Sequence, residues 1–380
     1  MSEESNYNGL HNFGATCFIN AVLQCLRFSV DISNNLFDNT EHKLDVDILD
    51  IINGFNAEDD CIHNDKFKKY ELDLEKIKHL NVYFHFKQLI IKIIKHNNVV
   101  VPKDFIISCK NHADSLLISG HKDVFSGEQN DPQQFLLYLL DTIELSKKMK
   151  TLLPELRYSS IEECTNSSDK ILFKLENDIL SHYKTTKGYS WVSKNFHCVY
   201  TSVVKCSKCP YYTIKFEPSQ ELSIEIPQNR TNLTIYDCLD HSLSKTILED
   251  WKCDDINCRN KLNNVKMNKL MNLPNTLIIF FKRYNYYSSG VKIMDHIDFP
   301  FILNMSNYKL INRDSEETYT LYGVVNQNGI LNNGHCYSFC RNINSRTDTN
   351  WYCFNDGNVF KVADSKVVTK HAYILFYKKL

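Results

Sequence analysis

The spacing of apolar residues changes from helical to alternating near residue 190, and this change constrains the fold more than any other feature of the chain. Two stretches of the first half, 81–96 and 131–149, repeat their apolar residues every three or four positions, as one face of a helix requires. The stretch 196–227 instead alternates and is rich in Val, Ile, Thr, Tyr and Phe, which is typical of strands. Helices followed by strands predict an α+β fold with segregated layers rather than a doubly wound sheet.

Local signals extend this assignment in both halves. A helix is predicted directly after Cys17, because the apolar residues that follow share one helical face; they are Phe18, Ile19, Val22, Leu23 and Leu26. Asp131 suits the N-cap of the helix over 131–149, and Pro132 suits its first position. The β-rich half continues through four more segments, which are 276–287, 319–342, 350–362 and 372–379.

The composition excludes several classes of protein. With 380 residues and 43% hydrophobic side chains, the chain can bury a sizeable core, and its length predicts two or three lobes. A net charge of -1 provides no basic field for nucleic acid or an anionic membrane surface. The first residues are acidic where a signal peptide needs a basic stretch and an apolar run, so we expect none, and no run approaches the ~18 apolar residues of a membrane span. We therefore expect a cytoplasmic or nuclear protein, whose 14 cysteines are reduced and serve as nucleophile, metal ligands or core.

Cys17 stands where "GLHNFGATC" runs into the first predicted helix. A helix N-terminus lowers the pKa of a thiol, because its unpaired N–H groups favour the thiolate. Asn12 lies five residues earlier and can direct an amide N–H to the oxyanion of a tetrahedral intermediate, with the Cys17 N–H as a second donor. A single cysteine is nevertheless more often a small buried hydrophobe, so both readings stay open at this point.

A thiol nucleophile needs a base, and the far end of the chain offers one. His335 follows a Gly- and Asn-rich loop at the head of an alternating stretch, and Asn355 and Asp356 stand side by side in a short turn twenty residues on. If the two stretches pair as antiparallel strands, the Asn355 oxygen accepts from one imidazole nitrogen and the other faces Cys17. An isolated histidine is more often structural, but the order Cys, His, Asn is the papain-like arrangement.

Two cysteine pairs predict a metal site. Cys206 and Cys209 form C-x2-C, and Cys253 and Cys258 form C-x4-C. Four thiolates suit tetrahedral Zn²⁺ and leave no open position, so the site would be structural. The alternative is four unrelated core thiols, which the charged residues around both pairs disfavour.

Together these motifs resemble the ubiquitin-specific proteases. "GLHNFGATCFINAVLQCL" is similar to the cysteine box of that family, and "NNGHCYSFCRN" with "NWYCFNDGNV" is similar to its histidine box. Three other stretches agree in order and spacing: "DPQQFLLYLLDTI" with the acidic-Gln helix motif, "YTSVVKCSKCPYYTIKFEPSQELSIEIP" with the first zinc knuckle, and "LPNTLIIFFKRY" with the core strand before the histidine box. The resemblance covers about residues 8–379, as one catalytic domain.

The resemblance implies a role for each residue of these motifs. Cys17 would be the nucleophile, His335 the base and Asn355 the orienting group, with Asp356 supporting the site and Asn12 donating to the oxyanion. The implied fold is a papain-like right hand, with a mainly helical thumb over 8–190, fingers tipped by a zinc ribbon over 191–275, and a β-rich palm over 276–379. Its members cleave after the Gly-Gly end of ubiquitin, so a channel lined by 326–334, including Gly334, would admit only glycine.

The sequence departs from the family pattern at three places. Cys336 stands between His335 and the first aromatic residue, which predicts a shift of the strand register by one. Gln134 replaces the usual glutamate of the acidic-Gln motif, so Asp131 carries its one carboxylate and recognition of the basic ubiquitin tail is expected to be weakened. Gln327 stands where a histidine often precedes the histidine box.

Three alternatives to a deubiquitinase stay open: a protease for another ubiquitin-like modifier, an inactive ubiquitin-binding scaffold, and a zinc-dependent binding module. For the deubiquitinase we expect ubiquitin and ubiquitinated proteins as partners, no nucleic acid or membrane, structural Zn²⁺ with no catalytic cofactor, and a monomer.

Overall fold

A computed structural model of the chain describes nine ranges of residues: 7–36, 74–96, 98–115, 122–146, 190–228, 230–284, 292–309, 316–330 and 333–380. These residues form two compact units. The first unit contains the described parts of Met1–Lys148, Ser190–Val192 and Tyr322–Leu375, and the second contains those of Ser193–Leu321 and Phe376–Leu380. Both helices and sheets are present, so the predicted α+β class is confirmed.

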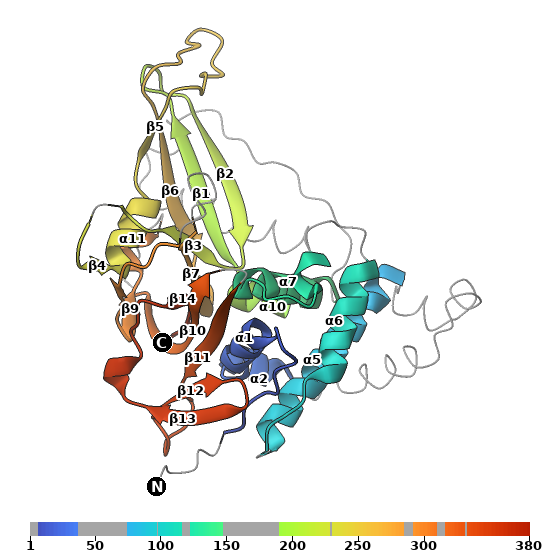
Figure 1. The fold of residues 1–380 in the computed structure, drawn as a ribbon. Coiled ribbons are helices and arrows are strands. Elements are labelled where there is room, and N and C mark those ends of the chain that lie inside the picture. Colours follow the sequence, from blue (N-terminus) through green and yellow to red (C-terminus); the bar gives the residue numbers. More distant parts are fainter. Residues whose placement is uncertain are drawn as a thin grey trace. The chain divides into compact units, whose positions relative to one another are not determined.

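Helices dominate the N-terminal part of the first unit (Figure 1). They are α1 (Cys17–Arg27), α2 (Val30–Leu36), α5 (Leu74–Lys95), α6 (Lys103–Ser115), the short η1 (Lys122–Phe125) and α7 (Pro132–Ser146), and α10 (Trp191–Phe196) follows at the boundary of the units. Every side chain of α1 is buried, because the helix packs against α7 on one side and β11 on another. The predicted cap of α7 is confirmed, since the carboxylate of Asp131 accepts the Gln133 N–H at 2.8 Å.

The C-terminal part of the first unit is a sheet in the order β13-β12-β11-β10-β14. Its strands are β10 (Thr318–Ile330), β11 (Asn333–Cys340), β12 (Trp351–Asn355), β13 (Asn358–Val362) and β14 (Ala372–Lys379), with the short η3 (Asp364–Lys366) before the last of them. β14 and the beginning of β10 also contribute residues to the second unit. Each of these strands lies in a segment that the alternating pattern predicts to be β-rich.

The pairing of β10 with β11 is regular, so the predicted shift of register is wrong. The ladder runs without interruption from Gly323 opposite Cys340 to Ile330 opposite Asn333. Cys336 takes an ordinary position opposite Gln327 and is buried with Ser338, two residues along the strand. A thiol fits this face as a small apolar group, and the strand therefore needs no extra residue. The ladder also places 326–330 in β10 and 333–334 in β11, where the sequence predicts a loop.

A four-stranded antiparallel sheet in the order β2-β1-β6-β5 forms one part of the second unit (Figure 1). Its strands are β1 (Cys198–Lys205), β2 (Tyr212–Ser219), β5 (Thr246–Leu248) and β6 (Asn264–Asn272). Side chains of neighbouring strands pack together across this sheet. Val203 and Tyr212 are buried, and Phe216 and Met267 pack against them. Both cysteine pairs lie in the turns that connect these strands.

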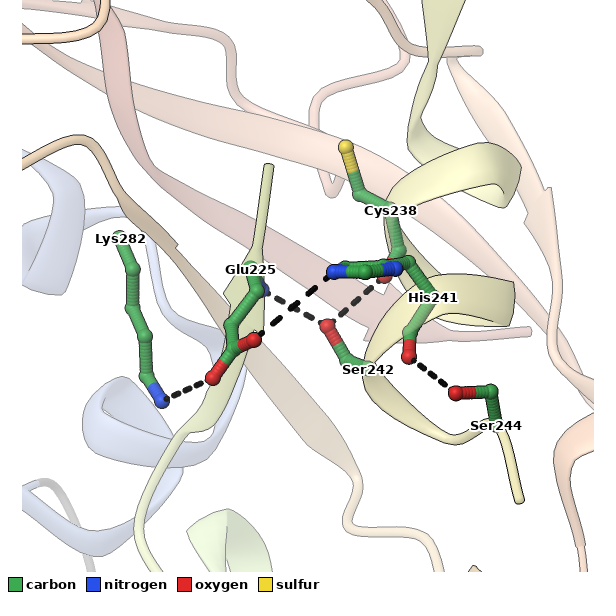
Figure 2. Close-up of polar contacts among 6 residues, drawn as sticks. All are labelled: Glu225, Cys238, His241, Ser242, Ser244 and Lys282. Atoms are coloured by element: carbon green, nitrogen blue, oxygen red, sulfur yellow. Dashed lines mark hydrogen bonds and ion pairs between the residues drawn. The ribbon is translucent and has the colours of Figure 1, made fainter. Parts of the chain in front are cut away.

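The rest of the second unit combines one helix with short strands. These elements are β3 (Leu222–Glu225), β4 (Leu233–Thr234), α11 (Ile235–Ser242), β7 (Thr276–Lys282), β8 (Ile297–Asp298), β9 (Ile302–Asn304) and the short η2 (Ser306–Tyr308). Figure 2 shows how α11 is fixed to β3, which pairs with β7 in parallel. The Ser242 hydroxyl accepts the Glu225 N–H at 2.7 Å and donates to the Cys238 carbonyl at 2.8 Å, while Lys282 pairs with the Glu225 carboxylate at 3.3 Å.

The described elements bear on two predictions, the absence of a membrane span and the division into thumb, fingers and palm. None of the described helices is long and apolar enough to cross a membrane. The two units do not follow the predicted boundaries of thumb, fingers and palm, because the first unit joins N-terminal helices to C-terminal strands. The three-part division therefore stays a prediction.

Candidate active site and metal site

Cys17 is the first residue of α1, as the sequence predicts, and the turn before it is built around Asn12. The Asn12 Oδ1 accepts the N–H of Gly14 at 2.9 Å and, from Thr16, the N–H at 3.2 Å and the hydroxyl at 3.1 Å. Gly14 has φ 106°, a left-handed conformation that glycine adopts without strain. One carboxamide thus folds the turn that presents the thiol at the helix start.

His335 and Asn355 meet through the pairing of β11 with β12. The two strands are antiparallel, with Ser338 opposite Phe354 and Phe339 opposite Cys353. This register carries Asn355 back beside His335, where its Oδ1 lies 2.6 Å from the Nε2 of the imidazole. The predicted strand pairing and the predicted contact between the two side chains are therefore confirmed.

The surroundings of Cys17 favour its thiolate. The Cys336 N–H lies 3.5 Å from the Cys17 Sγ, and the Cys336 side chain is buried beside it. The hydrogen bond from the Cys336 thiol is the largest effect; with the Cys336 N–H and the His335 charge it outweighs burial and lowers the Cys17 pKa to about 6. Burial alone would lower the pKa of His335, but the hydrogen bond to Asn355 and the Cys17 charge raise it. Near neutral pH this pair is suited to exist as thiolate and imidazolium.

Asp356 connects the two ends of the chain. It lies with Gly357 in a two-residue turn between β12 and β13 and has φ 51°, a conformation that Asp tolerates better than most residues. Its Oδ2 accepts from the Asn12 Nδ2 at 2.8 Å, and its Oδ1 accepts from the Asn20 Nδ2 at 2.8 Å. The carboxylate therefore holds the Asn12 amide in a fixed direction beside the nucleophile.

Gln129 belongs to this site, although sequence reasoning missed it. Its Nε2 lies 3.7 Å from the Cys17 Sγ, and its Oε1 accepts the Gly334 N–H at 2.7 Å. The side chain thus links the nucleophile to the strand that carries His335. Its position two residues before Asp131, at the start of the predicted helix motif, was the one available signal.

The residues predicted to contact a ubiquitin tail lie in different surroundings. Asp131 is buried, and its Oδ2 accepts from the Tyr373 hydroxyl at 2.9 Å, so its carboxylate already has a structural task. Gln134 is exposed on α7. A side chain at Gly334 would place a Cβ 2.5 Å from the carbonyl oxygens of Asn328 and Ile330, so this backbone accepts only glycine. Gln327, which the resemblance places where a histidine often precedes the histidine box, is buried.

The four predicted metal ligands come together in the second unit. The sulfurs of Cys206, Cys209, Cys253 and Cys258 all lie within 4.8 Å of one another. Two pairs are closer, at 3.7 Å for Cys206 with Cys258 and 3.5 Å for Cys209 with Cys253. A tetrahedron of sulfurs about 2.3 Å from a central Zn²⁺ has edges of about 3.8 Å, so the cluster fits this metal.

The residues around the cluster support a set of thiolates. The Cys206 Sγ accepts the Lys208 N–H at 3.4 Å and the Asn260 side-chain amide at 3.9 Å. Asn264 then joins the two turns, since its Oδ1 accepts from the Ser207 N–H and from the Asn260 amide, both at 3.2 Å. Such donors orient metal ligands and stabilise negative sulfur.

Comparisons with known proteins agree with this geometry. The sequence model of the ubiquitin carboxyl-terminal hydrolase family matches residues 8–377. A probable ubiquitin carboxyl-terminal hydrolase, R319 of Acanthamoeba polyphaga mimivirus, is 26% identical over 97% of this chain and 89% of its own length. Ubiquitin carboxyl-terminal hydrolase 2 of Homo sapiens is 25% identical over 97% of this chain, which spans 54% of that protein.

The fold is shared with solved structures. The structure of the SAGA Ubp8/Sgf11/Sus1/Sgf73 DUB module bound to ubiquitin aldehyde superimposes with a TM-score of 0.67 at 20% identity, and the match covers 100% of this chain and 71% of the solved one. A thiol at a helix start beside an imidazole from a distant strand is the arrangement of a papain-like cysteine hydrolase. The chain belongs to the ubiquitin carboxyl-terminal hydrolase family, a family of cysteine-type deubiquitinases.

Proposed function

We propose that this chain is a thiol-dependent deubiquitinase that hydrolyses the isopeptide or peptide bond after the C-terminal Gly-Gly of ubiquitin. The proposal rests on one observation: Cys17, at the start of α1, lies beside His335. The Asn355 Oδ1 lies 2.6 Å from the His335 Nε2 and holds the imidazole in place. The names of the relatives and the ubiquitin bound to the solved DUB module support the substrate class.

In the proposed reaction the thiolate of Cys17 attacks the carbonyl carbon of the last glycine. His335, as imidazolium, donates a proton to the leaving lysine amine, and a thioester between ubiquitin and Cys17 remains. The neutral imidazole then takes a proton from water as the water attacks the thioester, which releases the ubiquitin carboxylate and regenerates the thiolate. Asn355 keeps the imidazole in the required orientation throughout.

The oxyanion of both tetrahedral intermediates needs fixed donors. One N–H of the Asn12 Nδ2 is held by Asp356, and its second N–H serves as one donor, with the Cys17 backbone N–H as the other. Each such donor contributes about 3 kcal/mol to lowering the barrier. In this role Asp356 and Asn20 act as positioning residues, because Asp356 holds the Asn12 amide and Asn20 in turn donates to the Asp356 carboxylate.

Recognition of the ubiquitin tail rests on steric selection more than on charge. Gly334 and the Gln129 side chain form one wall beside the nucleophile, and Gly334 can carry no side chain. Asp131 and Gln134 remain the proposed tail contacts of α7. Because the Asp131 carboxylate is buried and bonded to Tyr373, we expect its electrostatic contribution to tail binding to be weak.

The proposed metal is Zn²⁺, held by Cys206, Cys209, Cys253 and Cys258. Four protein ligands leave no open position, so the ion would stabilise the second unit and take no part in the reaction. The solved DUB modules are complexes of several proteins, and they lend no support to the expectation of a monomer. Cytoplasm and nucleus stay the proposed compartments.

Hydrolysis of a ubiquitin-aminocoumarin reporter tests the proposal. We expect Cys17→Ala to reduce turnover on the order of 10⁴-fold or more, because no other group replaces the thiolate. The matched control is Cys109→Ala, which removes a buried thiol of α6 and should keep activity close to wild type. Wild-type turnover in the Cys17 variant would refute the mechanism. Labelling by a panel of vinyl-sulfone probes would show whether ubiquitin or another modifier is preferred.

A further inference from the structure

Two cysteine pairs line the interface between α1 and β11. Near the start of the helix, Cys17 lies beside Cys336, whose N–H is 3.5 Å from the Cys17 sulfur. Two turns further along the helix, the Cys25 Sγ lies 3.6 Å from the Cys340 Sγ. Both pairs join α1 to β11, and all four side chains are buried.

The chemistry of the two pairs is opposite. Burial, together with the neighbouring Cys340 thiol, raises the pKa of Cys25 well above its usual range, and this thiol is therefore inert. Cys17 instead has a pKa of about 6, since the Cys336 thiol, the N–H of the same residue and the His335 charge favour the thiolate. Thiolates, and not thiols, react with peroxides.

We propose that Cys336 is a resolving cysteine, which forms a reversible disulfide with Cys17 when a hydroperoxide oxidises the nucleophile. In the first step the Cys17 thiolate attacks one oxygen of the hydroperoxide, the O–O bond breaks, and sulfenic acid forms. The other oxygen takes a proton from the His335 imidazolium and leaves as water or an alcohol. In the second step the Cys336 sulfur attacks the Cys17 sulfur, an S–S bond forms, and the hydroxyl leaves as water with the Cys336 proton.

The position of Cys336 favours this outcome over the alternatives. Its N–H lies 3.5 Å from the Cys17 sulfur and its side chain is buried, whereas an external thiol has to enter a site in which Cys17 is only 2% exposed. A second peroxide, which would carry Cys17 irreversibly to sulfinic acid, arrives by diffusion and competes with a neighbouring group. The disulfide would therefore protect the nucleophile, and its effect on activity rests on the proposed function of Cys17.

Peptide mass spectrometry of the full chain tests the disulfide directly. The reduced protein is treated with hydrogen peroxide, the peroxide is removed with catalase, free thiols are alkylated, and the protein is digested without reductant. We expect a cross-linked peptide pair that contains Cys17 and Cys336 and is two hydrogen atoms lighter than the separate peptides. The absence of this pair in oxidised wild type would overturn the proposal.

Recovery of activity gives a second readout, with each variant compared with its own untreated rate. Wild type should regain most of its reporter hydrolysis after dithiothreitol. Cys336→Ser keeps a hydroxyl beside Cys17 but cannot form the disulfide, so at least about fivefold less activity should return, with Cys17 found as sulfinic or sulfonic acid. Cys340→Ser changes the inert pair on the same strand and should recover like wild type.

Equal recovery in Cys336→Ser and wild type would overturn the proposal. If untreated wild type cleaves no ubiquitin reporter, that result counts against the proposed function alone. The mass of the Cys17 peptides then still decides whether Cys336 resolves the oxidised nucleophile.

Discussion

The sulfur of Cys17 in the first unit and the four clustered cysteine sulfurs in the second unit have opposite surroundings. Around Cys17 the neighbours are N–H donors, one thiol and an imidazole, which stabilise a single negative charge. In the proposed metal site each sulfur is surrounded by other sulfurs within 4.8 Å, an arrangement that suits a shared cation. In the proposed function the same residue type serves as a nucleophile where its neighbours donate hydrogen bonds, and as a metal ligand where its neighbours are other thiols.

Cys206→Ser should show the largest difference between the metal site and the active site in metal content and unfolding temperature. Loss of one thiolate should reduce metal content well below one equivalent and lower the unfolding temperature, because structural Zn²⁺ contributes on the order of 10 kcal/mol to folding. Cys17→Ala should leave both quantities at their wild-type values, which metal analysis and thermal unfolding can check. Equal destabilisation by Cys206→Ser and Cys17→Ala would show that the metal site and the active site do not differ in their contribution to stability.

Asp356→Ala tests how the reactive sulfur is supported. The substitution removes the acceptor that holds the Asn12 amide at 2.8 Å, so the oxyanion loses a fixed donor. We expect kcat to fall about 100-fold while KM changes little. The matched variant is Asp356→Asn, which removes the charge of the side chain and keeps its size and shape. A larger effect on KM than on kcat would indicate a role in binding instead.

Gln129→Ala tests the link between Cys17 and β11. The variant loses the hydrogen bond to the Gly334 N–H and the contact with the Cys17 sulfur. One neutral hydrogen bond contributes about 1 kcal/mol, so we expect kcat/KM to fall about fivefold to tenfold. The control is Gln228→Ala, which makes the same change at an exposed residue of the second unit. A loss as large as that of Asp356→Ala would place Gln129 among the groups that stabilise the transition state.

The pH profile should show the smallest effect. Activity should rise with a midpoint near pH 6, as Cys17 becomes a thiolate, and fall again where His335 loses its proton, above its usual pKa. Asn355→Ala removes the hydrogen bond that raises the His335 pKa, so its falling limb should move to lower pH, by a fraction of a unit to about one unit. A falling limb that does not move would show that Asn355 does not raise the pKa of His335.

The sequence predicts the fold and the site well where a pattern is local. The alternating period locates β10 to β14, and the order of Cys17, His335 and Asn355 predicts which side chains meet. Contacts between distant segments outside these motifs follow no such pattern. Gln129 reaches Cys17 across 112 positions, and a lone glutamine in a turn carries no spacing that marks it.

The incorrect prediction at Cys336 has the same origin. An unusual residue after His335 looked like an insertion, because the sequence alone does not show which face of β11 it occupies. In the structure the thiol lies on the buried face opposite Gln327, where its small size is compatible with an unbroken ladder. Its partner on that face, Cys17, lies 319 positions away.

The turn at Asp356 also determines when the protein can become active during its synthesis. The Leu10 N–H donates to the Asp356 carbonyl at 2.8 Å, and a Cβ at Gly9 would collide with the same oxygen. Residues 9 and 10 therefore dock on a turn that the ribosome makes much later. In the proposed mechanism a growing chain carries Cys17 before it carries His335 and this turn, so it stays inactive until translation has passed both.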